Sequence, residues 1–149
     1  METINGLPAH VLLVHLVVVM LPLASALAVI GSLWPAAQRK FTFLTPLAAL
    51  AGLVAVPLTI NAGAALADHL QLGEAINQHA TLGRRVLPMA IALFVTTAGQ
   101  WAYLAYARPK TWVTILIAAL VIISAVATTV QVTLTGDAGA RMVWGSTFE

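Results

Sequence analysis

Four long apolar runs, separated by shorter polar segments, organise the whole sequence. A helix that crosses a bilayer needs about 20 apolar residues, and each run is long enough to supply one. The third run is extended backwards to Glu74, because residues 74–82 contain no proline or glycine. The expected helices cover about residues 8–34, 42–67, 74–107 and 112–135.

The connections between these helices are short, so consecutive helices are expected to run antiparallel. The pattern therefore predicts an all-α fold, an integral membrane four-helix up-down bundle that occupies residues 1–149 as a single domain. Small residues at four-residue spacing favour close helix packing, because lipid offers no hydrophobic drive for association. Examples are Ala24/Ala28/Ser32, Ala48/Gly52, Ala51/Ala55 and Ser124/Thr128. No internal repeat is evident.

Composition agrees with a membrane protein and removes several classes of function. The 149 residues are 60% hydrophobic and 8% charged, whereas soluble domains carry about 25% charged residues. The absence of cysteine excludes disulfides, thiolate metal sites, iron–sulfur clusters and cysteine nucleophiles. The scattered charges form no basic surface, so no nucleic-acid partner is expected. The first apolar run follows Glu2 with no Lys or Arg before it, so we expect it to be retained and not cleaved as a signal peptide.

The distribution of charge predicts an orientation in the membrane. With four spans, both termini and the second connection lie on one side, and the first and third connections lie on the other. The first and third connections carry four of the seven basic residues and no acid: Arg39, Lys40, Arg108 and Lys110. By the positive-inside rule these connections are cytoplasmic and both termini are external. The alanine-rich, lysine-poor composition indicates a bacterium, so the expected location is the bacterial inner (plasma) membrane, as a multi-pass protein.

All four histidines fall toward the membrane face that carries the termini. Ionisable residues within apolar helices are costly in hydrocarbon, so by default they mark a functional site or a buried contact. His10 and His15 are five residues apart, so on an ideal helix they point about 140° apart and each faces a different neighbour. One interpretation is a structural polar cluster, whose members hydrogen-bond the helix ends together. This predicted polar cluster consists of His10, His15, Asp68, His69, His79 and Asp137.

Two other interpretations involve a cofactor. Neutral imidazole and carboxylate suit a divalent metal such as zinc or copper, and histidines from two helices can hold a b-type haem. The candidate ligands are His10, His15 and His79, of which only His15 is expected to lie deep in the bundle. Catalytic chemistry has no support, because the sequence lacks a phosphate-binding glycine loop, a G-x-S-x-G segment and an H-E-x-x-H helix. No enzymatic activity and no catalytic residue are therefore expected.

The segment at the head of the first helix is distinctive: Gly6-x-Pro8-x-His10-x4-His15. Together with Asp68, His79, Thr135-Gly136-x2-Gly139 and Val143, it resembles the bacterial four-helix membrane family catalogued as domain of unknown function 2231. The resemblance covers nearly the whole chain. It implies an integral membrane protein of four helices, in a family associated with a redox or cofactor role. Its characteristic polar positions would be His10, His15, Asp68 and His79.

The sequence departs from the family pattern at two places. Val11 and Leu16–Val17 stand where the family usually has proline and phenylalanine-proline, and Asp137 stands where it usually has a histidine after Thr-Gly. Loss of that histidine favours the structural cluster over a cofactor site. The chain is therefore expected to be a non-catalytic accessory subunit of a larger membrane complex, with an aerobic respiratory (cytochrome or oxidase) assembly as the leading candidate. Its partners would be other integral membrane subunits and lipid, with no resident cofactor; the alternative is a haem- or metal-binding membrane protein that uses the three candidate histidines.

Overall fold

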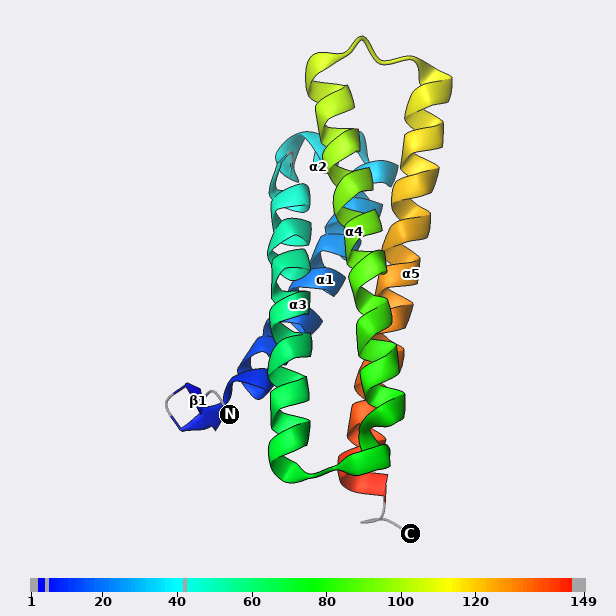
Figure 1. The fold of residues 1–149 in the computed structure, drawn as a ribbon. Helices are drawn as coiled ribbons and strands as arrows, with labels where there is room; N and C mark the ends of the chain where they lie inside the picture. The colour runs from blue at the N-terminus through cyan, green and yellow to red at the C-terminus, as the bar shows by residue number, and fades with distance from the viewer. Residues whose placement is uncertain (1–2, 5, 42, 146–149) are drawn as a thin grey trace.

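The computed structural model describes residues 3–4, 6–41 and 43–145, and its main feature is a bundle of four long antiparallel helices (Figure 1). These helices are α1 (Ala9–Leu33), α3 (Leu44–Leu70), α4 (Asn77–Tyr106) and α5 (Thr111–Trp144). Each of them is long and apolar enough to cross a bilayer. The prediction of an all-α four-helix membrane bundle is confirmed.

The connecting segments contain shorter elements that the sequence pattern did not predict. A hairpin of β1 (Thr3–Ile4) and β2 (Leu7–Pro8) precedes α1, and α2 (Pro35–Phe41) follows it. A 3-10 helix, η1 (Gly73–Ile76), leads from α3 into α4. The proline at the start of α2 suits that place, because the first position of a helix needs no backbone N–H.

The last helix is longer than the sequence analysis predicts. It continues well beyond Thr135, whereas the expected helix ends at about residue 135 and is followed by a tail. The added segment contains no proline, its alanines favour helix, and Asp137 pairs with Arg141 one turn later at 2.8 Å. Two glycines cost more than an exposed ion pair returns, so the helix also depends on packing: Ala138 is buried and the His79 ring lies on Gly139. The predicted boundary is too early.

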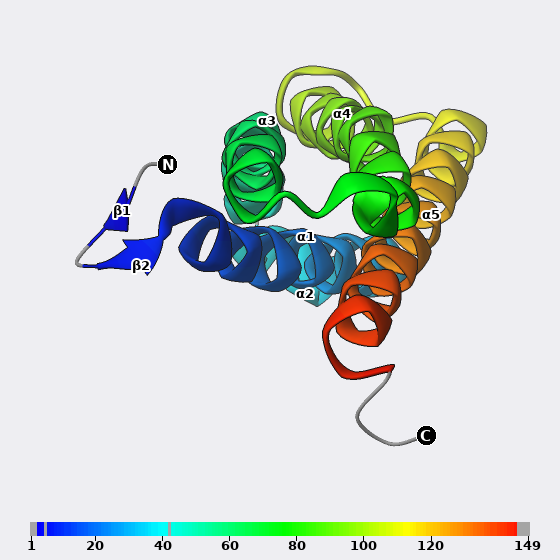
Figure 2. The same cartoon turned by 60° about the horizontal axis from the view of Figure 1, so that its bottom comes forward.

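Each long helix packs against two neighbours, in the order α1, α3, α4, α5 and back to α1, so α1 and α4 are diagonal partners (Figure 2). The core is built largely from small side chains, since alanines on all four helices are buried. Small residues let the helix backbones approach closely. Leu21, Leu93 and Val121, from three different helices, are fully buried among them.

Large apolar side chains cover the outside of the bundle, with exposed examples on every long helix: Val19, Val54, Val95 and Ile123. Polar side chains bond across the helix interfaces instead. Gln131 Nε2 donates to the Leu82 carbonyl at 3.0 Å, and Thr128 Oγ1 donates to the Met89 carbonyl at 3.1 Å. Apolar outer faces and internally paired polar groups are what hydrocarbon requires. The chain is therefore a multi-pass membrane protein.

Candidate functional site

His10 lies in the first turn of α1 and is partly buried against α3. Its Nδ1 is 3.0 Å from the carbonyl oxygen of Thr59. Gly63, one turn further along α3, makes room for the ring, because a Cβ at that position would lie 2.9 Å from ring atoms Cε1 and Nδ1. The imidazole therefore packs directly on the backbone of α3.

His79 makes the same contacts in the other half of the bundle. Its Nδ1 is 3.0 Å from the carbonyl oxygen of Thr135 on α5, and a Cβ at Gly139 would lie 3.0 Å from Cε1 and Nδ1 of the ring. Thr59 and Thr135 also donate Oγ1 to the carbonyl four residues earlier on their own helices, at 2.7 and 2.8 Å. The α1–α3 and α4–α5 hairpins are thus two copies of one arrangement.

This duplication is a repeat that the sequence analysis misses. A histidine near the start of one helix meets a Thr-x3-Gly segment on the following long helix. The two segments are 59–63 and 135–139. Thr59 and Gly63 are not among the predicted site residues, and the recurrence of the Thr-x3-Gly spacing is the signal that could have identified them.

The two imidazole rings meet across the bundle, because α1 and α4 are diagonal partners. We refer to His10 and His79 as the histidine pair; their ring centroids are 6.4 Å apart and their planes are at 90°. A carbonyl oxygen only accepts hydrogen bonds, so each neutral ring donates from Nδ1 and keeps a lone pair on Nε2. Neither Nε2 bonds a residue that the structure describes. Metal-bound histidines have this arrangement, with one ring nitrogen tied to a carbonyl and the other facing the metal.

A bound metal ion and a haem differ in how many protein side chains they need as ligands. Within the described residues, no group of three or more His, Asp or Glu side chains could hold a metal ion, whereas zinc sites use about three or four protein ligands. A haem iron needs only axial ligands from the protein. The ring centroids of the histidine pair are 6.4 Å apart at 90°, an edge-to-face contact that brings one candidate ligand from α1 and one from α4 to the same place.

His15 does not join the histidine pair, although the sequence analysis names it as a candidate ligand. Its side chain is exposed on the outer face of α1, and its Nδ1 bonds the carbonyl of Val11 on the same helix. Five residues of helix turn it about 140° away from His10. The three candidate ligands therefore reduce to His10 and His79.

The structure does not assemble the predicted polar cluster. Asp68 and His69 are exposed near the end of α3, and Asp137 is exposed on α5, where its Oδ2 accepts a hydrogen bond from Arg141 Nε. Asp137 lies two residues beyond the threonine that binds His79, but two residues of helix turn its side chain about 200° away. Of the six predicted members, only the two of the histidine pair are brought together across helices. The aspartate that replaces the family's usual histidine therefore leaves this pair intact.

The histidine pair lies near the membrane boundary and not at the centre of the bilayer. Arg84 and Arg85 are exposed on α4, about 8 Å further along the bundle than His79. From Arg85 to Trp101 the helix rises about 24 Å, close to the ~30 Å thickness of a hydrocarbon core. His10 is at the level of His79 because their rings are adjacent, so both rings lie in the polar boundary region.

Comparison with known proteins gives one family and no individual relative. No curated protein and no solved structure matches the chain. The model of the family described as "Predicted membrane protein (DUF2231)" matches residues 6–148. This range contains the histidine pair and both Thr-x3-Gly segments. The chain therefore belongs to this family of predicted membrane proteins, as the resemblance of its sequence indicates.

Proposed function

We propose that this protein is a small membrane cytochrome in which His10 of α1 and His79 of α4 would hold one b-type haem. The observation that carries the proposal is the duplicated geometry of the histidine pair, in which each Nδ1 bonds a carbonyl and each Nε2 lacks a described partner. Neither Nε2 is among the buried side-chain atoms that lack a partner in the described residues, so each is accessible from outside the helix packing, as an atom that binds a ligand must be. When bound, the haem would supply one-electron redox chemistry.

The chain's own residues would orient the two ligands. The carbonyls of Thr59 and Thr135 fix the tautomer and the rotation of each ring, as outer-shell partners of metal-bound histidines do. Gly63 and Gly139 let the rings rest on helix backbone, which restricts their movement. A site at the polar boundary also suits haem, since its charged propionate groups avoid the cost of burial in hydrocarbon.

The test is an absorption spectrum of the full chain, purified in mild detergent and reconstituted with haemin. We expect a Soret band and sharp visible bands on reduction, both lost in His10→Ala and in His79→Ala. His15→Ala is the matched control. His15 is on α1, like His10, but its side chain is exposed and does not belong to the histidine pair. Its spectrum should equal that of the unmodified chain.

Two outcomes would contradict the haem proposal. One is the absence of a Soret band after reconstitution. The other is a loss of haem in His15→Ala as large as in His10→Ala. Stoichiometric zinc or copper in the purified chain, without a Soret band, would assign the pair to a metal ion instead, with water completing the coordination.

We further propose that the histidine pair faces the outside of a bacterial inner membrane. The support is the charge distribution, since the first and third connections carry four of the seven basic residues. The wider role as an accessory subunit of an aerobic respiratory assembly rests on small size and on the redox association of the family. Mild-detergent purification with native mass spectrometry tests it, and a chain that always runs without oxidase or cytochrome subunits would contradict it.

A further inference from the structure

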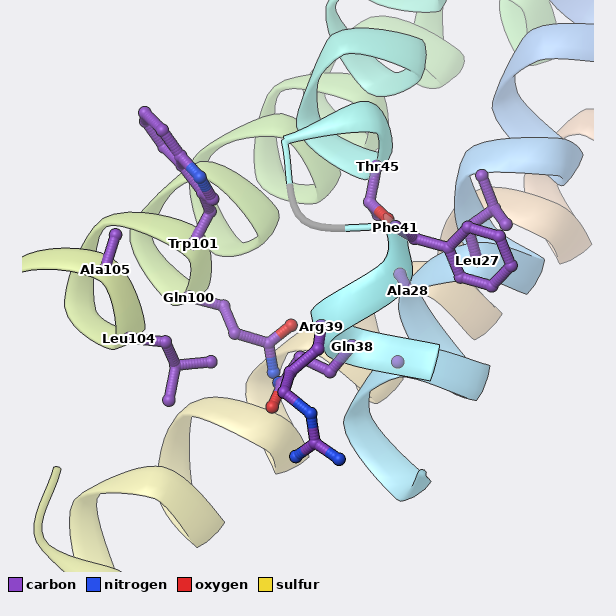
Figure 3. A pocket seen from close by; sticks show the side chains of 11 residues that line it. Leu27, Ala28, Gln38, Arg39, Phe41, Thr45, Gln100, Trp101, Leu104 and Ala105 are labelled. Carbon is purple, nitrogen blue, oxygen red and sulfur yellow. The ribbon is translucent and has the colours of Figure 1, made fainter. Parts of the chain in front are cut away.

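A second site lies at the end of the bundle opposite to the histidine pair. We call this the short-connection end, because it carries the connections from α1 to α3 and from α4 to α5 (Figure 1). A cavity of about 320 Å³ opens there between α1, α2 and α4 (Figure 3). This volume is at the lower limit of typical ligand sites, which measure about 300–1,000 Å³.

The walls of the cavity divide into an apolar part and a polar part. Leu27 of α1 and Leu104 of α4 supply apolar surface, whereas Gln38, Arg39 and Gln100 supply hydrogen-bond donors. Gln100 is nearly buried, and its Nε2 donates to Ser32 Oγ at 3.1 Å, which holds the amide in place. The cavity is therefore amphipathic, with a polar wall held by α2 and α4.

The charge of the polar wall is positive and unbalanced. Arg39 forms no ion pair with a described carboxylate. The three acidic residues that the structure describes, Asp68, Glu74 and Asp137, lie toward the other end of the bundle. The other basic residues of the short-connection end, Lys40, Arg108 and Lys110, do not line the cavity, and no acid lies beside them in the sequence. A ligand of this cavity is expected to be an anion.

The depth of the cavity indicates where that anion comes from. Trp101 lines it, and tryptophan is typical of the membrane–water interface, the level of lipid headgroups. Basic pockets between membrane helices are known to bind anionic lipid headgroups. We propose that this cavity binds the phosphodiester headgroup of an anionic phospholipid, with Arg39 on the phosphate and the acyl chains along the apolar surface beside Leu27 and Leu104.

The proposal is independent of the haem site and is tested by thermal unfolding of the full chain in detergent. Phosphatidylglycerol should raise the unfolding temperature, whereas phosphatidylcholine and inorganic phosphate should not. In Arg39→Gln the apparent affinity for phosphatidylglycerol should fall roughly five- to tenfold, the order expected when one basic contact is lost. Arg108→Gln is the matched control, because it removes the same charge from an exposed connection at the same end of the bundle.

Three results would overturn the lipid site. Equal shifts with phosphatidylcholine would show that the charge of the headgroup is irrelevant. A full shift with inorganic phosphate alone would replace the lipid by a free anion. An equal loss in Arg108→Gln would show a general surface potential instead of a site. If Arg39→Gln unfolds without lipid, Arg39→Lys keeps the positive charge and should keep the preference for phosphatidylglycerol over phosphatidylcholine. Loss of that preference would contradict the proposal.

Discussion

Replacing Gly63 by alanine tests how closely the His10 ring packs on α3. The added Cβ would lie 2.9 Å from Cε1 and Nδ1 of the ring, whereas non-bonded carbon atoms prefer a separation of about 3.5 Å. The ring must therefore move by about 0.6 Å. That movement weakens the 3.0 Å contact between His10 Nδ1 and the Thr59 carbonyl, which orients the ring.

The expected change in the free energy of unfolding combines one stabilising and two destabilising contributions. Alanine in place of glycine stabilises a helix by up to about 1 kcal/mol. Overpacking a tight contact costs about 1–3 kcal/mol, and a lost interhelical hydrogen bond in a membrane protein costs about 0.6 kcal/mol. Gly99→Ala isolates the first term, because no neighbouring atom lies within 4 Å of a Cβ at that position. We expect the free energy of unfolding of Gly63→Ala to fall about 2 kcal/mol below that of Gly99→Ala.

The assay is equilibrium unfolding of the full chain in mixed detergent, followed by circular dichroism, with haem content measured on the same samples. Gly63→Ala should lose stability and haem together, whereas Gly99→Ala should keep both. Gly139→Ala should behave like Gly63→Ala, because its Cβ would lie 3.0 Å from the His79 ring. Equal stability and equal haem content in the variants at 63 and 99 would refute the packing of His10 on α3.

Two further predictions concern the interior and the orientation. Ser25→Ala should leave the free energy of unfolding unchanged or raise it, because the buried Oγ has no partner among the described residues. Thr128→Val should lower it by about 1 kcal/mol through the lost bond to the Met89 carbonyl, and an equal loss in Ser25→Ala would contradict this contrast. The chain has no cysteine, so single cysteines at Gln78 and Ala107 report sidedness with an impermeant maleimide. In intact spheroplasts Gln78→Cys should react and Ala107→Cys should not, and the opposite result would reverse the proposed orientation.

The fold was largely predictable because each membrane span depends on a property that is local in the sequence. About 20 consecutive apolar residues must form a helix in lipid, since the helix is the only conformation in which one segment pairs its own backbone N–H and C=O groups. Short connections then impose the antiparallel order. The end of α5 was the main error, because the glycines at 136 and 139 indicate a tail, whereas packing of Ala138 and of Gly139 against the His79 ring continues the helix.

For the candidate site, too, one part could be predicted from the sequence and another part could not. The sequence by itself determined that all four histidines lie toward one membrane face, because the number of spans between two residues decides which face each one reaches. Only the tertiary structure decided that His10 and His79 meet and that His15 points outward. These outcomes depend on how each helix is rotated about its axis and on which helices are diagonal. Packing between segments far apart in the chain sets both, through the glycines at 63 and 139 that admit the rings.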